Sequence, residues 1–388
     1  MTVNEIFRTY SNEYLAEYPF TSIFERKIIN SISKCRTAKM GGRIEKCDHC
    51  GHKVLYYNSC RNRHCPSCQF IKKEQWIESR QNEVLPFQYF HVVFTIPDRL
   101  NPIVYRNKRI MYNLLFKAVK ETLIDIALTE KYFGAKIGFF SILHTWGQKL
   151  NLHPHLHCVV PGGGYDEAAK IWKKTPKNYL LPIIVLRKRF RSLFLKNLKL
   201  LYNENELYLK GTKYQDPELF QNLIDNLFKT EWVLYLKESF NNSDSVIKYL
   251  AKYTHRIAIS NYRIIKVEDR CVHFWYKDYK DNNKKKVMVV DVIKFIRLFL
   301  LHVVPKRYIR IRYYGLLSHR CKKSNIEACY RFFNIKQKYR EEPKSLAELM
   351  LELTGTDIRK CPKCGKGFMV KTKELPAQRY RPSPEKIA

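Results

Sequence analysis

The chain has 388 residues, which is enough for two or three folding units with cores of their own. Its 71 lysine and arginine residues against 36 aspartate and glutamate residues give a net charge of +35, spread along the whole length. This excess favours a polyanion as partner, most simply DNA, over an anionic membrane, and a hydrolase of small substrates would not need it. The sequence lacks both a run of about 18 apolar residues and a signal peptide, which predicts a cytoplasmic protein with no membrane partner.

Twelve cysteines in a cytoplasmic protein predict reduced thiols or metal ligands rather than disulfides. Residues 1–34 carry apolar side chains at three-to-four spacing, which predicts a helical arm that packs on the rest of the chain. Two Cys-x-x-Cys pairs follow, separated by fourteen residues. This spacing matches a structural Zn²⁺ site with Cys47, Cys50, Cys65 and Cys68 as ligands, and free thiols or a redox pair are the alternative.

Three more residues beside these pairs could replace one of the four ligands or build a second site. They are His52, Cys60 and His64. Arg61 and Arg63 lie between the pairs, so we expect the zinc module to contact DNA as well as to hold itself together.

A polar helix is predicted from residue 72 to 83, and residues 88–96 alternate and then become apolar, which is typical of a strand. His91 lies inside this strand and is more often a core residue than a ligand, so we regard it only as a residue that could orient a ligand. Residues 105–128 form an amphipathic helix pattern, and residues 137–148 a second buried strand. This order predicts an α+β fold with a central antiparallel sheet flanked by helices.

Residues 152–164 read LHPHLHCVVPGGG, with histidines at three alternate positions. In a strand, alternate side chains project from the same face, so His153, His155 and His157 would share one edge suited to a metal ion. The alternative is a strand whose histidines only form hydrogen bonds. His144 and Gln148 lie close enough in sequence to reach the same metal across a hairpin.

Residues 166–230 form an insert with a predicted helix near 182–201 that is rich in lysine and arginine. These charged residues would form either a solvated helix face or a ridge that faces DNA. A strand is predicted at 232–240 and a short helix at 245–253. Tyr249 and Tyr253 are four apart and so lie on one face of this helix. The spacing alone is weak evidence, because the chain holds 26 tyrosines and Tyr10, Tyr14 and Tyr18 repeat it.

The remaining sequence predicts a hairpin over 271–291, a helix at 292–303 and a strand at 308–312. The basic C-terminal region contains Cys361-Pro-Lys-Cys364, half of a second zinc site that His319, Cys321 or Cys329 could complete. A turn with two free thiols is the alternative. Residues after Lys373 are expected to be disordered.

Four segments resemble the two-tyrosine rolling-circle transposases of bacterial insertion sequences, the ninety-one-like family of the His-hydrophobe-His endonuclease superfamily. The segments are CDHCGHKVLYYNSCRNRHCPSC, FHVVFTIP, HTWGQKLNLHPHLHCVVPGGG and YLAKYTHRIAIS, within residues 20–315. The resemblance implies a helical transposase zinc-binding domain at 1–85 and a catalytic domain at 86–315 with a five-stranded antiparallel sheet. Residues 316–388 would be a basic region with the half zinc site and a disordered tail.

Residue by residue, the resemblance makes His155 and His157 the metal-binding histidines and Tyr249 and Tyr253 the nucleophiles. It implies a DNA transposase and endonuclease that cleaves and rejoins single-stranded element ends and target DNA through a 5′-phosphotyrosine, with Mg²⁺ or Mn²⁺ as catalytic ion. The third metal ligand stays open between His153, His144 and Gln148. Histidines alone would also suit zinc.

Arg256, which follows the tyrosine pair, joins the two arginines of the zinc module as an expected DNA contact. The chain has no phosphate-binding glycine loop, so strands would be separated by a host helicase. Two rival functions remain: a plasmid replication initiator or relaxase, and a non-catalytic zinc-dependent DNA-binding protein. Location in the bacterial cytoplasm, at the nucleoid, would fit each of these DNA-bound functions.

Overall fold

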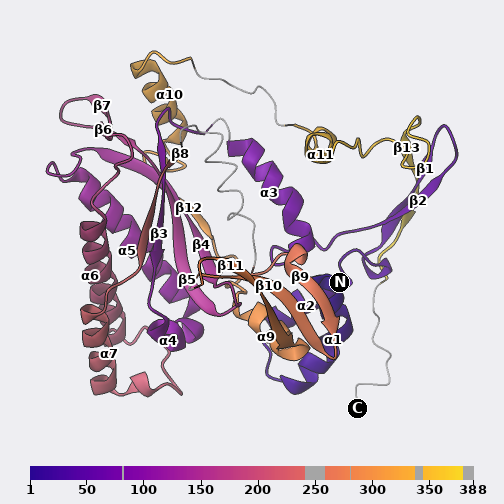
Figure 1. Ribbon diagram of the computed structural model, residues 1–388, viewed down its shortest axis with the longest axis horizontal. Helices are drawn as coiled ribbons and strands as arrows, with labels where there is room; N and C mark the ends of the chain where they lie inside the picture. Colours follow the sequence, from indigo (N-terminus) through magenta and orange to yellow (C-terminus); the bar gives the residue numbers. More distant parts are fainter. Residues whose placement is uncertain (81–82, 241–257, 280, 337–343, 379–388) are drawn as a thin grey trace. The chain divides into compact units, whose positions relative to one another are not determined.

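The computed structural model describes residues 1–80, 83–240, 258–279, 281–336 and 344–378 (Figure 1). The chain forms two compact units. The first comprises Met1–Glu78, His255–Leu300 and Glu341–Ala388, and the second comprises Ser79–Thr254 and Leu301–Arg340. The chain therefore leaves the first unit and returns to it twice. Within the described ranges, no helix combines the length and the apolar character needed to cross a membrane.

The first unit contains five α-helices and six strands among the described residues. The helices are α1 (Val3–Glu17), α2 (Ile23–Lys34), α3 (Pro66–Arg80), α9 (Val292–Leu301) and α11 (Leu346–Thr354). The strands are β1 (Gly42–Cys47), β2 (Lys53–Tyr57), β9 (Ile264–Glu268), β10 (Cys271–Asp278), β11 (Lys284–Asp291) and β13 (Met369–Leu375). They form two antiparallel sheets, with strand orders β13-β1-β2 and β11-β10-β9.

The helical arm predicted over residues 1–34 consists of the two helices α1 and α2. Both begin with a capping box, in which Thr2 pairs with Glu5 and Ser22 with Glu25 through reciprocal backbone and side-chain hydrogen bonds. Pro19 lies between them and cannot continue a helix. Phe7 of α1 packs edge-on against Phe299 of α9, so the arm shares a core with residues that lie almost 300 positions later in the chain.

In the part of the chain that the structure describes, the second unit is built on one seven-stranded sheet. Its strands are β3 (Tyr89–Thr95), β4 (Lys136–Trp146), β5 (Leu152–Pro161), β6 (Gly163–Asp166), β7 (Ile171–Lys174), β8 (Leu234–Phe240) and β12 (Ile311–Gly315). The order is β7-β6-β4-β5-β3-β8, with β12 paired to β4, and every pairing is antiparallel. The helices are α4 (Asn101–Arg106), α5 (Lys108–Leu128), α6 (Ile183–Asn203), α7 (Pro217–Lys229) and α10 (Lys322–Phe332).

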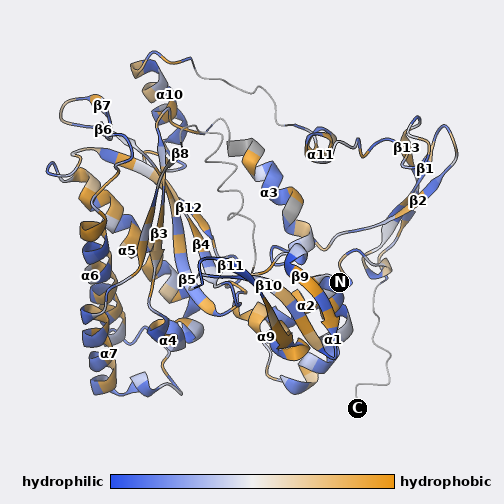
Figure 2. Cartoon of the chain, in the orientation of Figure 1, coloured by the Kyte–Doolittle hydropathy of each residue, from blue (hydrophilic) through white to orange (hydrophobic). Residues whose placement is uncertain are grey.

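Alternation along the central strands gives this sheet two different faces. One face carries Phe90, Val92, Phe94, Leu156, Cys158 and Val160, which join one core cluster with buried residues of α5, α6 and α7. These three helices lie together beside the sheet in Figure 1, and Figure 2 shows hydrophobic residues interspersed with hydrophilic ones along them. The opposite face therefore carries the histidines at positions 91, 144, 155 and 157.

The predicted fold class, α+β with a central antiparallel sheet flanked by helices, is confirmed. The sheet has seven strands rather than the five that the resemblance implied, because the short hairpin of β6 and β7 extends it. Strand β13 reaches Leu375, so the expected disorder does not begin at Lys373. The division at 1–85, 86–315 and 316–388 stays a prediction.

Candidate metal centres

Three histidines of the second unit offer ligand nitrogens that lie within 4.8 Å of one another: His144 on β4, and His155 and His157 on β5. In the antiparallel register of these strands, His144 is directly opposite His155. His155 and His157 are two positions apart and so share a face. The hairpin of β4 and β5 is therefore sufficient to bring the three rings together.

The hydrogen bonds around the rings orient their nitrogens. The Nδ1–H of His155 donates to the carbonyl oxygen of His153 at 2.6 Å, which leaves Nε2 as the ligand atom. Nδ1 of His157 lies 2.7 Å from Nε2 of the buried His91. The Nε2 atoms of His155 and His157 lie 3.1 Å apart. Two imidazoles that each present Nε2 to a common point fit a divalent ion with nitrogen ligands.

The ligand His155 and His91, the neighbour of His157, are both held in the neutral form. Burial, together with the nearby His153, lowers the pKa of His155 to about 3. Burial also lowers the pKa of His91 to about 4, with a further contribution from Lys237. A protonated imidazole cannot bind a cation, so the shift at His155 keeps this ligand competent through the neutral pH range. A neutral His91 can accept a hydrogen bond from Nδ1–H of His157, which leaves Nε2 of His157 for the metal.

Of the three residues left open as third ligand, His144 is the one that the structure groups with His155 and His157. His153 is partly exposed, and its Nδ1 lies 3.2 Å from a carboxylate oxygen of Asp98. Gln148 lies in the turn between β4 and β5.

That turn is fixed by a histidine that sequence reasoning missed. His302, 2% exposed, lies with Nε2 3.0 Å from the carbonyl oxygen of Leu150 and Nδ1 3.3 Å from the hydroxyl of Thr145. It links the end of β4 to the turn that leads into β5. A single histidine after a helix gives no sequence signal of this role.

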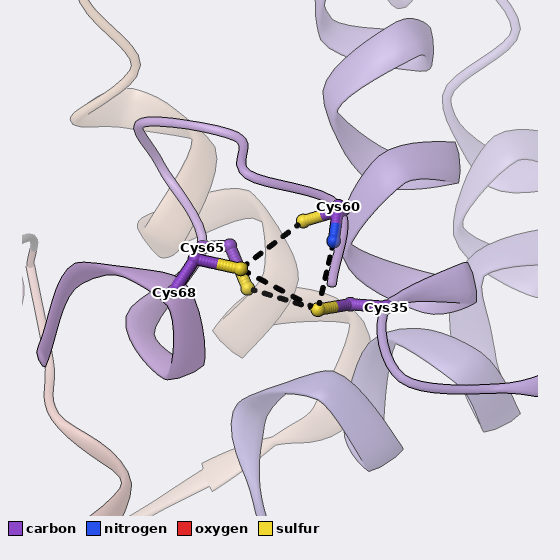
Figure 3. A group of neighbouring side chains, drawn as sticks. All are labelled: Cys35, Cys60, Cys65 and Cys68. Carbon is purple, nitrogen blue, oxygen red and sulfur yellow. Dashed lines mark hydrogen bonds between the residues drawn. The ribbon is translucent and has the colours of Figure 1, made fainter. Parts of the chain in front are cut away.

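In the first unit, four cysteines form a compact group: Cys35, Cys60, Cys65 and Cys68. Cys35 ends α2, Cys60 follows β2, and the other two flank the start of α3. Figure 3 shows their sulfur atoms turned toward one another. Their Sγ–Sγ distances are 3.6 Å for Cys35–Cys68, 3.7 Å for Cys60–Cys68 and 3.8 Å for Cys35–Cys65.

These distances fit a tetrahedral zinc site. Zinc–sulfur bonds of about 2.3 Å place neighbouring sulfurs about 3.8 Å apart, whereas a disulfide needs about 2.05 Å. Hydrogen bonds from Cys60 and Cys65 lower the pKa of Cys35 to about 7, which favours its thiolate. The side-chain amide of Asn4 donates to Cys65 Sγ at 3.3 Å.

The predicted grouping of Cys47, Cys50, Cys65 and Cys68 is wrong. Cys65 and Cys68 belong to the group just described, whereas Cys47 and Cys50 lie with Cys361 and Cys364 in a second one. The reason is the pairing of β13 with β1, which brings the C-terminal Cys-x-x-Cys pair beside the N-terminal one.

Because β13 pairs with β1, Cys361 and Cys364 lie beside Cys47 and Cys50. The three residues expected to complete their site do not belong to this group. Cys321 contacts the hydroxyl of Ser318, Cys329 is buried in a small core cluster, and His319 packs on Tyr313.

Comparison with known proteins assigns two parts of the chain to families. Residues 6–96 match a family described as "Transposase zinc-binding domain", of the IS91 type, and residues 138–325 match one described as "Putative transposase". The chain is 43% identical over 373 residues to "Putative transposase y4qJ" of Sinorhizobium fredii, covering 95% of this chain and 94% of that protein. The chain belongs to the IS91 family of insertion-sequence transposases.

A more distant member of the family is the "Transposase for insertion sequence element IS801" of Pseudomonas savastanoi pv. phaseolicola. It is 27% identical over 311 residues, which cover 76% of this chain and 71% of that protein. No solved structure matches the chain. In this IS91-family chain, all four cysteines of the first group and none of the C-terminal pair fall within the zinc-binding match.

The other residues predicted for the zinc module lie around the two cysteine groups rather than in them. His52 accepts a hydrogen bond from the Cys47 N–H through its carbonyl oxygen, and His64 is buried with its Nδ1 3.3 Å from the side chain of Asn62. Arg61 is exposed and Arg63 is partly buried, which lowers its pKa. Tyr249, Tyr253 and Arg256 lie outside the described residues.

Proposed function

We propose that this IS91-family protein is the DNA transposase of an insertion sequence, which cleaves and rejoins single-stranded DNA through a tyrosine nucleophile in rolling-circle transposition. The observation that carries the proposal is the group of His144, His155 and His157 on one face of the sheet, within the stretch that matches the transposase family. Such a group can hold a divalent ion next to a phosphodiester, where the ion would assist cleavage.

The three histidines would hold Mn²⁺ or Mg²⁺. Imidazole ligands favour Mn²⁺ of the two, since Mg²⁺ prefers oxygen. The bound ion would polarise the scissile phosphate and offset the charge that develops on its oxygens. The chain's own contribution is the fixed orientation of His155 by the His153 carbonyl and the support of His157 by His91.

Tyr249 and Tyr253 are the proposed nucleophiles. The phenol oxygen of one tyrosine gives up its proton and forms a bond to phosphorus. The bond from phosphorus to the 3′ oxygen breaks, and that oxygen takes up a proton and leaves as a 3′-hydroxyl. The DNA end stays attached to the protein as a 5′-phosphotyrosine, whose bond energy allows rejoining without ATP. The second tyrosine could accept the next strand while the first is occupied.

The basic surface would supply affinity for DNA. Because the net charge is +35, many phosphate contacts are available without sequence preference. Arg61, Arg63 and Arg256 are the proposed contacts near the zinc module and the tyrosines. The protein would act on element ends and target DNA in the bacterial cytoplasm, at the nucleoid, with strands separated by a host helicase.

The test is a gel assay for covalent adducts on single-stranded DNA from the element's own ends, with Mn²⁺ or with EDTA. A 3′-end label should move with the protein and a 5′-end label should be released, because the protein stays on the 5′ phosphate. We expect a metal-dependent adduct that the double variant Tyr249→Phe/Tyr253→Phe loses entirely, while each single variant reports which tyrosine attacks first.

The matched control is Tyr10→Phe/Tyr14→Phe, a tyrosine pair at the same helical spacing on α1, which should keep the adduct. An adduct that survives in the Tyr249/Tyr253 double variant would contradict the assignment of the nucleophiles. Binding of verified ends with no adduct in the unaltered chain would leave a zinc-dependent DNA-binding protein. The match to a transposase zinc-binding domain favours the transposase over a replication initiator or relaxase.

A further inference from the structure

We propose that Cys47, Cys50, Cys361 and Cys364 bind a second structural zinc ion, which joins the N-terminal zinc-binding domain to the C-terminal segment of the same chain. The four Sγ atoms lie within 4.8 Å of one another. Cys47 and Cys364 are 3.7 Å apart at sulfur, and so are Cys50 and Cys361. These separations match the about 3.8 Å expected between thiolates on one tetrahedral zinc and exclude a disulfide.

The two Cys-x-x-Cys-Gly segments have the same backbone conformation. In the first, the N–H of Gly51 donates to the carbonyl of Cys47 at 3.1 Å, and in the second, Gly365 donates to Cys361 at 2.9 Å. Both glycines have positive φ, +70° and +67°, which side chains rarely adopt. Two tight turns that present cysteine pairs to each other are the arrangement of a zinc ribbon.

Backbone N–H groups also point at the sulfurs. The N–H of Cys50 donates to Cys47 Sγ at 3.4 Å. The N–H groups of Gly367 and Lys366 donate to Cys364 Sγ. Donors of this kind stabilise thiolates, which are the ligand form.

The surrounding backbone holds the two turns against each other. Strand β13 pairs with β1 from Gly42 opposite Leu375 to Cys47 opposite Met369. Beside the sulfurs, the N–H of Phe368 donates to the carboxylate of Asp48 at 2.8 Å, and the N–H of Asp48 donates to the carbonyl of Phe368 at 3.1 Å.

The two segments approach each other closely at a glycine. A Cβ at Gly367 would lie 2.6 Å from Cys47 Sγ and 2.5 Å from the Asp48 carboxylate, so no larger residue fits there without a shift. The two cysteine pairs are therefore held together by close packing of the backbone as well as by the positions of their side chains.

The site lies outside what the family comparison assigns. The zinc-binding match ends at residue 96 and the transposase match at residue 325, whereas half of these ligands are at 361 and 364. The zinc-binding domain is then completed by residues more than 300 positions later. Zinc binding at this second site would thus require that the whole chain has been made and that its C-terminal segment has returned to β1.

The experiment counts zinc per chain in the purified full-length protein, in a His155→Ala/His157→Ala background so that the histidine group does not contribute. We expect two zinc ions in this background and one in Cys361→Ser/Cys364→Ser. Cys47→Ser/Cys50→Ser should also retain one. The variant with all four substitutions should still retain one, because both pairs serve the same ion.

The matched control Cys271→Ser removes a thiol outside both groups and should leave two ions. The proposal is overturned if Cys361→Ser/Cys364→Ser keeps two ions, or if a folded variant with all four substitutions, checked by circular dichroism, has lost both. Titration of the metal-free background protein with Co²⁺ gives an independent reading. Saturation of the thiolate charge-transfer absorption at two ions per chain supports the proposal, and saturation at one overturns it.

Discussion

The histidine group and the cysteine groups are assembled in opposite ways. His144, His155 and His157 lie on two paired strands joined by a five-residue turn, so sheet hydrogen bonds fix their positions. The cysteines of each group come from separate turns, helix ends and loops, and four thiolates brought together repel one another. We infer that the histidine site is formed before metal arrives, whereas the cysteine sites need metal in order to fold.

The largest expected effect tests this contrast directly. Removal of zinc with a strong chelator should raise amide hydrogen exchange around Cys35, Cys60 and Cys65 to nearly unfolded rates, while β3, β4 and β5 stay protected. The apparent binding free energy of structural zinc, about 10–16 kcal/mol in small domains, is as large as the whole stability of a typical domain. Exchange measured by mass spectrometry before and after chelation provides the check.

Restoring Zn²⁺ should restore protection, which separates metal loss from damage by the chelator. Equal loss of protection in both units would show that the sheet also depends on metal. Unchanged exchange around the cysteines would show that the thiols are packed without an ion.

A second effect concerns the third ligand. His144→Ala should lower Mn²⁺ affinity about 100-fold or more, because it removes one of the three candidate ligand nitrogens. His153→Ala should change the affinity by less than about 3-fold, since that ring faces Asp98 at the edge of the site. Calorimetric titration of zinc-loaded protein distinguishes the two, and the reverse ranking would make His153 the ligand.

The histidine site also shows how much of the structure could be predicted from the sequence alone. The alternation of His155 and His157 is a local property of a strand, and it carried over directly into the structure. His144 stayed one of three possibilities because the hairpin register, which places it opposite His155, depends on the turn at 147–151. His302, which fixes that turn, comes from beyond α9 and had no visible motif.

The cysteines show the same limit more strongly. A Cys-x-x-Cys pair can be read from the sequence, but which pairs face each other depends on tertiary structure. Cys361 and Cys364 meet Cys47 because β13 pairs with β1. Cys35 is a single cysteine at the end of α2, and only the packing of that helix beside Cys65 and Cys68 makes it part of a group.

A third effect is acid sensitivity of the histidine-bearing unit. Burial lowers the pKa of His302 to about 3, so between pH 6.5 and that value the unfolded chain binds a proton that the folded chain does not. Stability should therefore fall as the pH falls through this window, by about 1.4 kcal/mol per pH unit for one such group. Urea unfolding of metal-free protein between pH 7 and 5 measures the slope.

His302→Gln should reduce that slope by about one proton, because glutamine does not titrate. An unchanged slope in this variant would mean that His302 does not account for any of the acid sensitivity. The control His319→Gln removes a histidine outside the turn, and an equal reduction of the slope in that variant would show that the effect is not specific to His302.

The smallest effect sharpens the claim that the histidine site is pre-formed. His91 is buried beside His157, and Nε2 of His91 lies 2.7 Å from Nδ1 of His157. His91 does not belong to the group of three candidate ligands. His91→Phe removes this partner and should lower Mn²⁺ affinity by about 10-fold, within the range for residues that orient a metal ligand. His91→Gln keeps an acceptor near the same place and should stay within about 3-fold of the unaltered protein. Equal losses in the two variants would show that His91 acts only by filling space, and no loss in either would show that the strands alone orient His157.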